Sequence, residues 1–317
     1  MTIAHFASAA DTAEQVPRVE ELAPDCYGFI SGHDPNCGFV VGRDAVLAVD
    51  TRATPPLARD LLRAIRSVTD LPVRYVFLTH YHAVRALGAS AFPDAVVIST
   101  AGTREWIETR GEADFASERD RFPRLFRGVE EIPGLTRPSL AFDGRLLLDL
   151  GGVEAEFRGF GRAHTQGDAV CWVADRKVLY AGDLAENRCG VYAGDAYIGE
   201  WIETLQRLRT VPAEAMVAGR GAVVRGREAV GTAIEGTAAF LSTLRRSVDE
   251  ARKGGADLAG CFRAAEAAMR PGFGDWPLFN HVLPFDVARA YEELSGVEHP
   301  TVWTAKRDKA LWDALRG

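Results

Sequence analysis

The sequence predicts an α/β fold in which two β-sheets pack together with helices outside them. Short apolar runs bounded by Gly, Asp, Asn or Pro, which are typical of strands, come in two series along the chain. An amphipathic helix lies within the first series, and helical periodicity dominates from about residue 226 onward. Strands and a helix, followed by strands and helices again, are typical of two packed sheets covered by helices.

The first series of strands leads to a strand that ends in two histidines. Strand-like runs occupy residues 26–30, 38–41 and 45–49. After Pro55-Pro56, apolar residues recur at helical spacing and predict an amphipathic helix: Leu57, Leu61, Ile65 and Val68. The run from Val73 to Leu78 is apolar apart from Arg74, so we expect a strand that is buried on both faces.

The second series is interrupted by a helical insertion over residues 101–140. Strands are expected at 95–99, 145–150, 153–157, 169–174, 177–181 and 215–218, with a tight hairpin at Asp175-Arg176. Apolar residues predict one helix around Trp201 to Leu208 and a long helix from Val230 to Val248. We therefore expect an N-terminal arm over 1–18, a core over 19–225 that contains the insertion, and a helical region over 226–317 packed on the core.

Composition and charge are those of an ordinary globular protein. Of 317 residues, 47% are hydrophobic and 26% are charged. The formal net charge of −7 argues against a general surface for nucleic acid or anionic membrane. We find no signal peptide and no apolar run near the roughly 20 residues that span a bilayer. The five cysteines are scattered and form no CxxC pair, which predicts reduced thiols in a cytoplasmic protein.

Three predicted strand ends carry side chains suited to a metal site. His80 and His82 are separated by one residue, so both imidazoles leave the chain on the same side and can reach one ion. His164 begins the run His-Thr-Gln-Gly-Asp, and Asp183 follows an apolar strand. Taken singly, each has a plainer interpretation: an incidental histidine pair, a hydrogen-bonded loop histidine, and a turn or capping aspartate.

Taken in order, these motifs resemble those of the metallo-β-lactamase superfamily over roughly residues 20–225. The resemblance implies an αββα sandwich with a metal centre at one edge, between the sheets. It maps His80, His82 and His164 to ligands of the first metal, and Asp183 to the carboxylate that normally bridges two metals. Asp50, at the end of the strand 45–49, matches an early aspartate that orients a ligand, with a turn residue as the alternative.

The chain departs from the family's pattern at the three ligands peculiar to the second metal. The usual run His-x-His-x-Asp-His is here His-Tyr-His-Ala-Val84-Arg85, and Arg220 stands where a histidine usually lies between two glycines. Valine has no donor atom and a guanidinium does not deprotonate in a protein, so neither ligates a metal. The sequence therefore predicts a mononuclear site. Residues 79–85, 182–186 and 281–286 are similar to a SoxH-like subgroup of the superfamily, a label that says little about the substrate.

Three imidazoles and one carboxylate suit Zn(II), one per chain, although Fe(II) or Mn(II) would also be accepted. A zinc-bound water has a pKa of about 7 and is a nucleophile at neutral pH, and Asp183 is a candidate to take its proton. Arg85 and Arg220 keep positive charge where the second ion would lie. They either hold an anionic group of the substrate, or one of them forms a salt bridge with Asp183.

Aromatic residues of the insertion are candidates for substrate walls, with a small hydrophobic core as the alternative: Trp106, Phe115 and Phe122. His281 lies ahead of a helix expected at 285–294 and is either a pocket group or a buried structural histidine.

The sequence thus predicts a metal-dependent hydrolase that acts on an ester, thioester, lactone or amide of a small molecule with an anionic group. A mononuclear iron oxygenase of the same fold and a non-catalytic descendant that keeps a structural metal are the alternatives. We expect no nucleic-acid or membrane partner, and a homodimer is compatible with the sequence.

Overall fold

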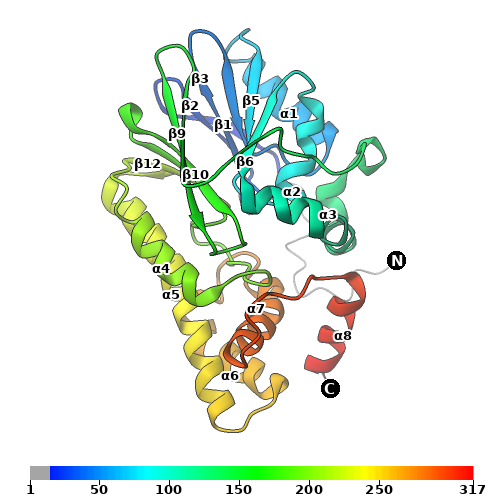
Figure 1. Ribbon diagram of the computed structural model, residues 1–317. Coiled ribbons are helices and arrows are strands. Elements are labelled where there is room, and N and C mark those ends of the chain that lie inside the picture. The colour runs from blue at the N-terminus through cyan, green and yellow to red at the C-terminus, as the bar shows by residue number, and fades with distance from the viewer. Residues whose placement is uncertain (1–14, 317) are drawn as a thin grey trace.

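Two mixed β-sheets stack face to face in the protein, whose structure is a computed structural model that describes residues 15–316 (Figure 1). Within that range the first sheet has the order β1 to β7: β1 (Arg18–Ala23), β2 (Cys26–Ile30), β3 (Cys37–Val41), β4 (Val46–Val49), β5 (Val73–Phe77), β6 (Val96–Thr100) and β7 (Leu140–Phe142). Strands β1 to β4 are antiparallel, and β4 to β7 are parallel. The parallel part brings the ends of β4, β5 and β6 to one edge.

The second sheet has the order β13-β12-β11-β10-β9-β8. Its strands are β8 (Arg145–Asp149), β9 (Glu154–Gly161), β10 (Asp168–Val173), β11 (Val178–Gly182), β12 (Ala215–Ala218) and β13 (Val224–Arg225). The expected hairpin joins β10 to β11 through a turn in which Lys177 has a φ of 54°. β11 and β12 are parallel, so their ends also meet at one edge of the sheet.

An apolar layer fills the space between the two sheets. Phe77 of β5 and Phe157 of β9 stack with ring centroids 4.3 Å apart, and Tyr180 of β11 donates a hydrogen bond to the Phe39 carbonyl at 3.1 Å. A Cβ on Gly38 would lie 2.2 Å from the Tyr180 ring, so a glycine is required where this ring packs against β3. Burial on this scale is the main stabilising term of such a sandwich.

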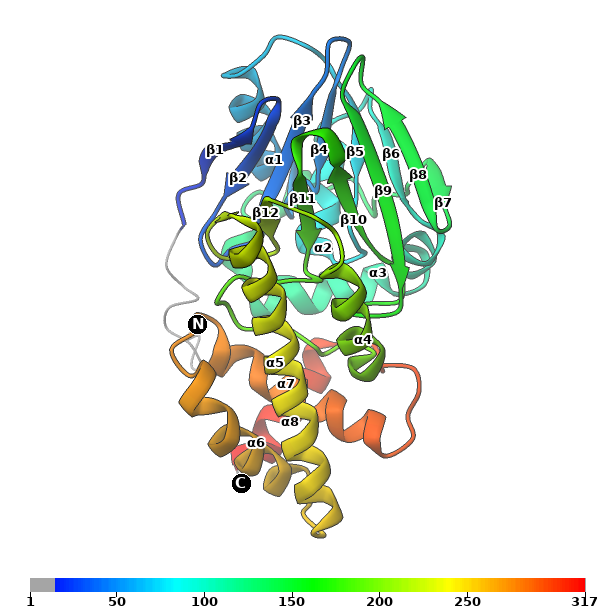
Figure 2. The same ribbon diagram turned by 90° about the vertical axis from the view of Figure 1, so that its left-hand side faces the viewer.

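Helices cover the outer faces and gather at one end of the sheets (Figures 1 and 2). They are α1 (Pro55–Arg66), α2 (Ala83–Ala86), α3 (Ala101–Arg121), α4 (Ile198–Leu208), α5 (Arg227–Lys253), α6 (Leu258–Phe273), α7 (Phe279–Leu294) and α8 (Ala305–Arg316). Short 3₁₀ turns lie at Leu87–Ala91, Pro123–Phe126, Val129–Glu131 and Ala174–Arg176. The predicted fold class, two packed sheets with outer helices and further helices toward the C-terminus, is confirmed.

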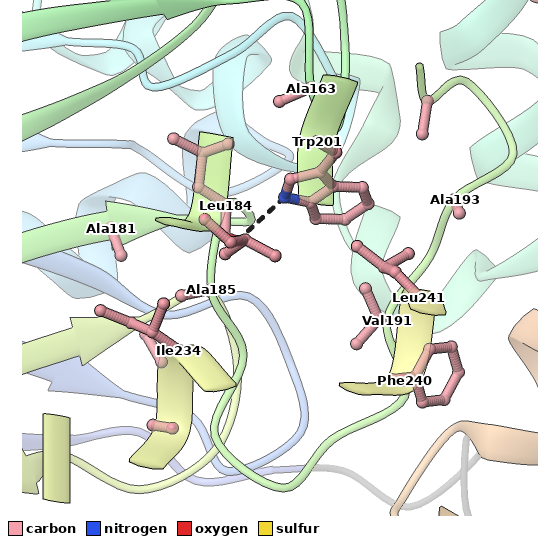
Figure 3. Packing of buried hydrophobic residues seen from close by; sticks show 14 of the residues in the cluster. Ala163, Ala181, Leu184, Ala185, Val191, Ala193, Trp201, Ile234, Phe240 and Leu241 are labelled. Carbon is pink, nitrogen blue, oxygen red and sulfur yellow. Dashed lines mark hydrogen bonds between the residues drawn. The ribbon is translucent and has the colours of Figure 1, made fainter. Parts of the chain in front are cut away.

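A large apolar core on the outer face of the second sheet joins this sheet to the C-terminal helices. Figure 3 shows the Trp201 ring of α4 beside Leu184, with Leu241 of α5 nearby. The indole Nε1 donates to the Leu184 carbonyl at 3.1 Å, which satisfies the one polar atom of this buried ring. This core lies directly behind the strand end that carries Asp183.

Several element boundaries differ from the expectation. β1 begins at Arg18, within the expected arm, whose residues 1–14 lie outside the described range, and β7 lies at the end of the expected insertion. The expected burial of the strand 73–78 on both faces is wrong for its first half, because only the end that enters the sandwich is covered. α7 begins at Phe279 rather than after Pro284, so His281 lies inside the helix. Pro284 removes one backbone hydrogen bond, which the surrounding packing tolerates.

No helix of the described chain is long and apolar enough to cross a membrane. All five cysteines are buried, and no disulfide joins any two described residues.

Candidate metal centre

Four buried side chains meet at the edge of the sandwich nearest the C-terminal helices. We call them the metal-site cluster: His80, His82, His164 and Asp183. One potential ligand atom of each lies within 4.8 Å of the others. Asp183 Oδ2 is 3.6 Å from Nε2 of both His80 and His164, and His164 Nε2 is 3.2 Å from His82 Nδ1. The predicted ligands are therefore brought together from three separate parts of the sequence.

Strand ends place these side chains. His80 follows β5, His164 lies between β9 and β10, and Asp183 follows β11. Gly182, the last residue of β11, has a φ of 52°, and a Cβ there would lie 2.6 Å from the Thr79 Cβ. The glycine thus allows the end of β11 to approach the chain just before His80, which sets the spacing between the aspartate and the histidines.

One ring nitrogen of each histidine faces the cluster, and the other has a hydrogen-bond partner. Thr79 Oγ1 donates to Asp50 Oδ2 at 2.9 Å and therefore accepts from His80 Nδ1 at 3.0 Å. His164 Nδ1 donates to the Tyr192 carbonyl at 3.0 Å. His82 Nε2 contacts Asp195 Oδ2 at 3.1 Å. Such partners fix the tautomer and the orientation of metal-binding imidazoles.

The residues present fit a metal ion. His80 Nε2 is buried and has no hydrogen-bond partner among the described residues. A buried, unprotonated ring nitrogen without a partner costs free energy unless a ligand satisfies it. Nε2, Nδ1, Nε2 and a carboxylate oxygen form a donor set that suits Zn(II) and related divalent ions.

Electrostatics keep two of the histidines neutral. Burial holds the pKa of His80 well below its ordinary value, although Asp183 opposes this shift. Burial and the neighbouring His82 lower the pKa of His164 to about 3. Burial alone would raise the pKa of Asp183, but the charges of Arg85 and Arg220 outweigh it and hold that pKa well below its ordinary value. The aspartate is therefore a stable carboxylate and a weak proton acceptor.

Both arginines contact Asp183, as the salt-bridge alternative expected of one of them. Arg85 donates through Nη2 to Asp183 Oδ1 and, at 2.8 Å, to the Gly219 carbonyl. Its Nη1 donates to the Asn36 carbonyl and lies 3.4 Å from Asp50. Arg85 is 1% exposed and its fork is occupied by these acceptors.

Arg220 is bound less completely than Arg85. Its Nη1 lies 3.0 Å from Asp183 Oδ2 and 2.9 Å from Glu186 Oε1, and its side chain is 13% exposed. Glu186 also accepts from the Arg220 backbone N–H. Burial and the nearby Asp183 raise the pKa of Glu186 to about 8, although Arg220 opposes this shift.

The remaining predicted residues lie farther from the metal-site cluster. Trp106 is buried and its ring contacts Tyr81 edge-on at 4.9 Å, and the Tyr81 ring in turn lies 4.6 Å from that of His82. His281 is buried in α7 with its ring 4.6 Å from that of Phe122. Burial and the charge of Arg121 lower the pKa of His281 to about 3. Val84 is buried in an apolar cluster with Leu125 and Phe126.

Asp195 and the acidic pair of α3 are functional candidates that sequence reasoning missed. Asp114 accepts from the Ala83 backbone N–H at 2.7 Å, and Glu118 accepts from that of Val84 at 2.9 Å. Asp114 and Glu118 are four residues apart, which could have indicated that they share one face of a helix but not that this face is buried. Asp195 has no local signature that sequence reasoning could have used.

A sandwich of two mixed sheets with histidines and an aspartate at strand ends defines a class of αββα metalloproteins. The model of the metallo-beta-lactamase superfamily matches residues 31–220, more than half of the chain. The protein belongs to the metallo-β-lactamase superfamily. The SoxH-like subgroup stays a prediction.

Solved structures share the fold at low sequence identity. One is the stereoselective inverting sec-alkylsulfatase Pisa1 from Pseudomonas sp., with 16% identity and a TM-score of 0.70 over 88% of this chain and 50% of that chain. Another is a metallo-β-lactamase from Pontibacter korlensis, with 17% identity and a TM-score of 0.56 over 69% of this chain and 99% of that chain. The protein thus spans about half the length of the alkylsulfatase.

Proposed function

We propose that this protein is a metal-dependent hydrolase with one divalent ion per chain. The convergence of three imidazole nitrogens and one carboxylate carries the proposal, because each histidine is bound through its other nitrogen and His80 Nε2 is left without a partner among the described residues. Zn(II) is the ion we assign, and Fe(II) and Mn(II) accept the same donors.

The cluster residues hold the ion, and their neighbours hold the cluster. A bound divalent cation would lower the pKa of water and polarise the oxygen of a carbonyl or similar electrophilic group. Asp183 is assigned to metal binding rather than to proton transfer, because its lowered pKa makes it a weak base. Arg85 forms ion pairs with Asp183 and Asp50, and we assign it the space that the family's second-metal histidine would take.

Arg220 is the residue to which we assign an anionic group of the substrate. It contacts the two carboxylates through Nη1, so we assign the other nitrogens of its partly exposed fork to the substrate. A guanidinium binds carboxylate, phosphate or sulfate oxygens in pairs. The substrate class is therefore an ester, thioester, lactone or amide that carries an anionic group, and a sec-alkyl sulfate joins the test panel because one structural neighbour is a sec-alkylsulfatase.

Elemental analysis and a hydrolysis panel test the proposal. Chelator-treated protein is reconstituted with Zn(II), Mn(II) or Fe(II), freed of excess metal and assayed with each substrate class with and without oxygen. We expect about one ion per chain and oxygen-independent hydrolysis. His80→Ala and His164→Ala should lose both metal and activity while the far-UV circular dichroism spectrum is retained.

Other outcomes identify the alternatives. Two tightly held ions per chain would contradict the mononuclear assignment. Oxygen-dependent turnover with iron would favour an oxygenase, and a bound metal without turnover on any substrate would favour a structural metal.

A further inference from the structure

A short segment after β11 lies between the metal-site cluster and the C-terminal helices. We call residues 192–199 the positioning segment. It contacts two of the three histidines: the Tyr192 carbonyl accepts from His164 Nδ1 at 3.0 Å, and Asp195 Oδ2 accepts from His82 Nε2 at 3.1 Å. Asp195 is 2% exposed.

Asp195 is itself held in place. The Tyr81 hydroxyl donates to the same oxygen, Asp195 Oδ2, at 2.8 Å. Tyr81 stands between the ligands His80 and His82 in the sequence and is buried against Trp106. The carboxylate therefore accepts from two groups that belong to the histidine motif, and its position and that of the His82 ring are coupled.

One face of α7 binds the backbone of the positioning segment. Three ionisable residues of α7 recur at helical spacing: Asp286, Arg289 and Glu293. Asp286 accepts from the Ala193 N–H at 2.6 Å, and Arg289 Nε donates to the Ala196 carbonyl at 2.6 Å. Glu293 accepts from two further backbone N–H groups of the segment, at 2.7 and 3.0 Å. Trp303 adds a hydrogen bond to the Gly194 carbonyl at 2.9 Å.

These contacts lie in the interior, where hydrogen bonds are strong and a missing partner is costly. Asp286 and Arg289 are each 0% exposed. Both belong to the part of the chain beyond residue 220, where the family match ends. The backbone of the positioning segment is thus fixed by side chains of the C-terminal helices.

We propose that Asp195 is a positioning residue for His82, and that α7 holds the metal centre in shape through the positioning segment. Because Nε2–H of His82 donates to Asp195, Nδ1 is the nitrogen presented to the metal. The inference rests on the proposed function, since it concerns the ligands of that metal site.

Co(II) titration of the metal-free protein against a competing chelator tests the role of Asp195. We expect Asp195→Ala to weaken Co(II) binding about 10- to 100-fold and to change the Co(II) absorption spectrum, which reports coordination geometry. Asp195→Asn should lose less, because the amide oxygen still accepts from His82. Tyr81→Phe should lose less again, because it removes only the anchor of Asp195.

Tyr180→Phe is the matched control for Tyr81→Phe. It also deletes a buried hydroxyl that donates a hydrogen bond, but in the layer between the sheets. We expect wild-type Co(II) affinity and spectrum from this variant, so that a loss in Tyr81→Phe cannot be ascribed to general destabilisation.

Two substitutions of Asp286 test the role of α7. Burial raises the pKa of Asp286 well above its ordinary value and so favours the neutral carboxyl, which an amide resembles in charge and shape. Asp286→Ala removes the acceptor for the Ala193 N–H, and we expect Co(II) binding about three- to tenfold weaker. Asp286→Asn keeps an acceptor oxygen and should restore wild-type affinity.

The outcomes separate this inference from the proposed function. If wild-type protein binds Co(II) and Asp195→Ala binds it with equal affinity and an identical spectrum, the positioning role is wrong and the metal site stands. Equal Co(II) affinities for Asp286→Ala and Asp286→Asn would show that α7 does not hold the metal centre in shape. If folded wild-type protein binds no Co(II), the proposed function fails and the inference falls with it.

Discussion

His82 differs from the other two histidines in the charges that surround it. Burial alone would lower its pKa, but the carboxylates of Asp114 and Asp195 outweigh this and raise the pKa to about 9. In the metal-free protein at neutral pH, His82 therefore carries a proton on each ring nitrogen. Nε2–H donates to Asp195, and Nδ1–H points to His164 Nε2.

Metal binding should displace the Nδ1 proton of His82. Because metal binding displaces a proton, the affinity for the metal rises with pH up to the pKa of the group that loses this proton. We expect about one proton released per metal at pH 7, and about a tenfold gain in affinity per pH unit up to pH 9, where the gain ends. Titration calorimetry in buffers of different ionisation enthalpy measures the release. An affinity that stays constant between pH 7 and pH 9 would show that His82 is already deprotonated.

Substitutions of Arg220 test whether this residue binds an anionic group of the substrate. If its fork binds an anionic group, Arg220→Ala should raise KM for the anionic substrate and leave a neutral analogue nearly unaffected. A lost charge-assisted hydrogen bond corresponds to about 1.5–3 kcal/mol, so a ten- to hundredfold rise is expected. Arg220→Lys should recover part of it, because an ammonium lacks the planar fork. An equal loss for both substrates, together with a lower Tm, would assign Arg220 to the salt bridge with Asp183 alone.

At the scale of elements, the approach of β11 to the end of β5 sets the geometry of the cluster. Gly182 has a left-handed backbone, and a Cβ there would lie 2.5 Å from Thr79 Oγ1, the atom that links Asp50 to His80. Gly182→Ala should destabilise the protein by about 1–3 kcal/mol and weaken metal binding as well. Urea unfolding and metal titration measure the two effects.

Gly272→Ala is the control for this substitution. Gly272 lies in α6, and a Cβ there would meet no described atom within 4 Å. Its stability and metal affinity should match the wild type within about 1 kcal/mol. Loss of metal affinity in this variant would mean that the effect of Gly182→Ala is not local.

The sequence predicted those elements whose signals are local. Apolar strands that end in His80 or Asp183 carry their own pattern, and the order of the motifs indicated that they meet.

Asp195 could not be found, because its contact with His82 spans 113 residues and depends on how α7 holds the positioning segment. The buried Asp114 and Glu118 look like a solvated helix face, since in α3 burial follows contacts with α2 rather than apolar periodicity. The start of α7 was missed because Pro284, a typical boundary signal, lies within the helix.

At the scale of the whole molecule, the sandwich and the C-terminal helices meet at the candidate metal centre. The ligands belong to loops of the sandwich, whereas the side chains that hold the positioning segment belong to α7. The core around Trp201 also joins β11 to α5 (Figure 3). A ligand that stabilises this junction should therefore stabilise both parts together, because neither can unfold without breaking the contacts of the other.

Metal removal should lower the Tm of sheets and helices by the same amount. At a free metal concentration a hundredfold above Kd, binding contributes about 2.7 kcal/mol, which corresponds to a shift in Tm of about 4 °C for a chain of this size. Far-UV circular dichroism follows the helices, and tryptophan fluorescence follows the surroundings of the six tryptophans, which include Trp172 of β10 and Trp201 of α4. The His164→Ala variant, which lacks a ligand, should show no shift with metal. If the helical signal melts at an unchanged temperature while the fluorescence transition moves, α7 is not coupled to the metal centre, because a helix that holds the ligands in place must share in the free energy of binding them.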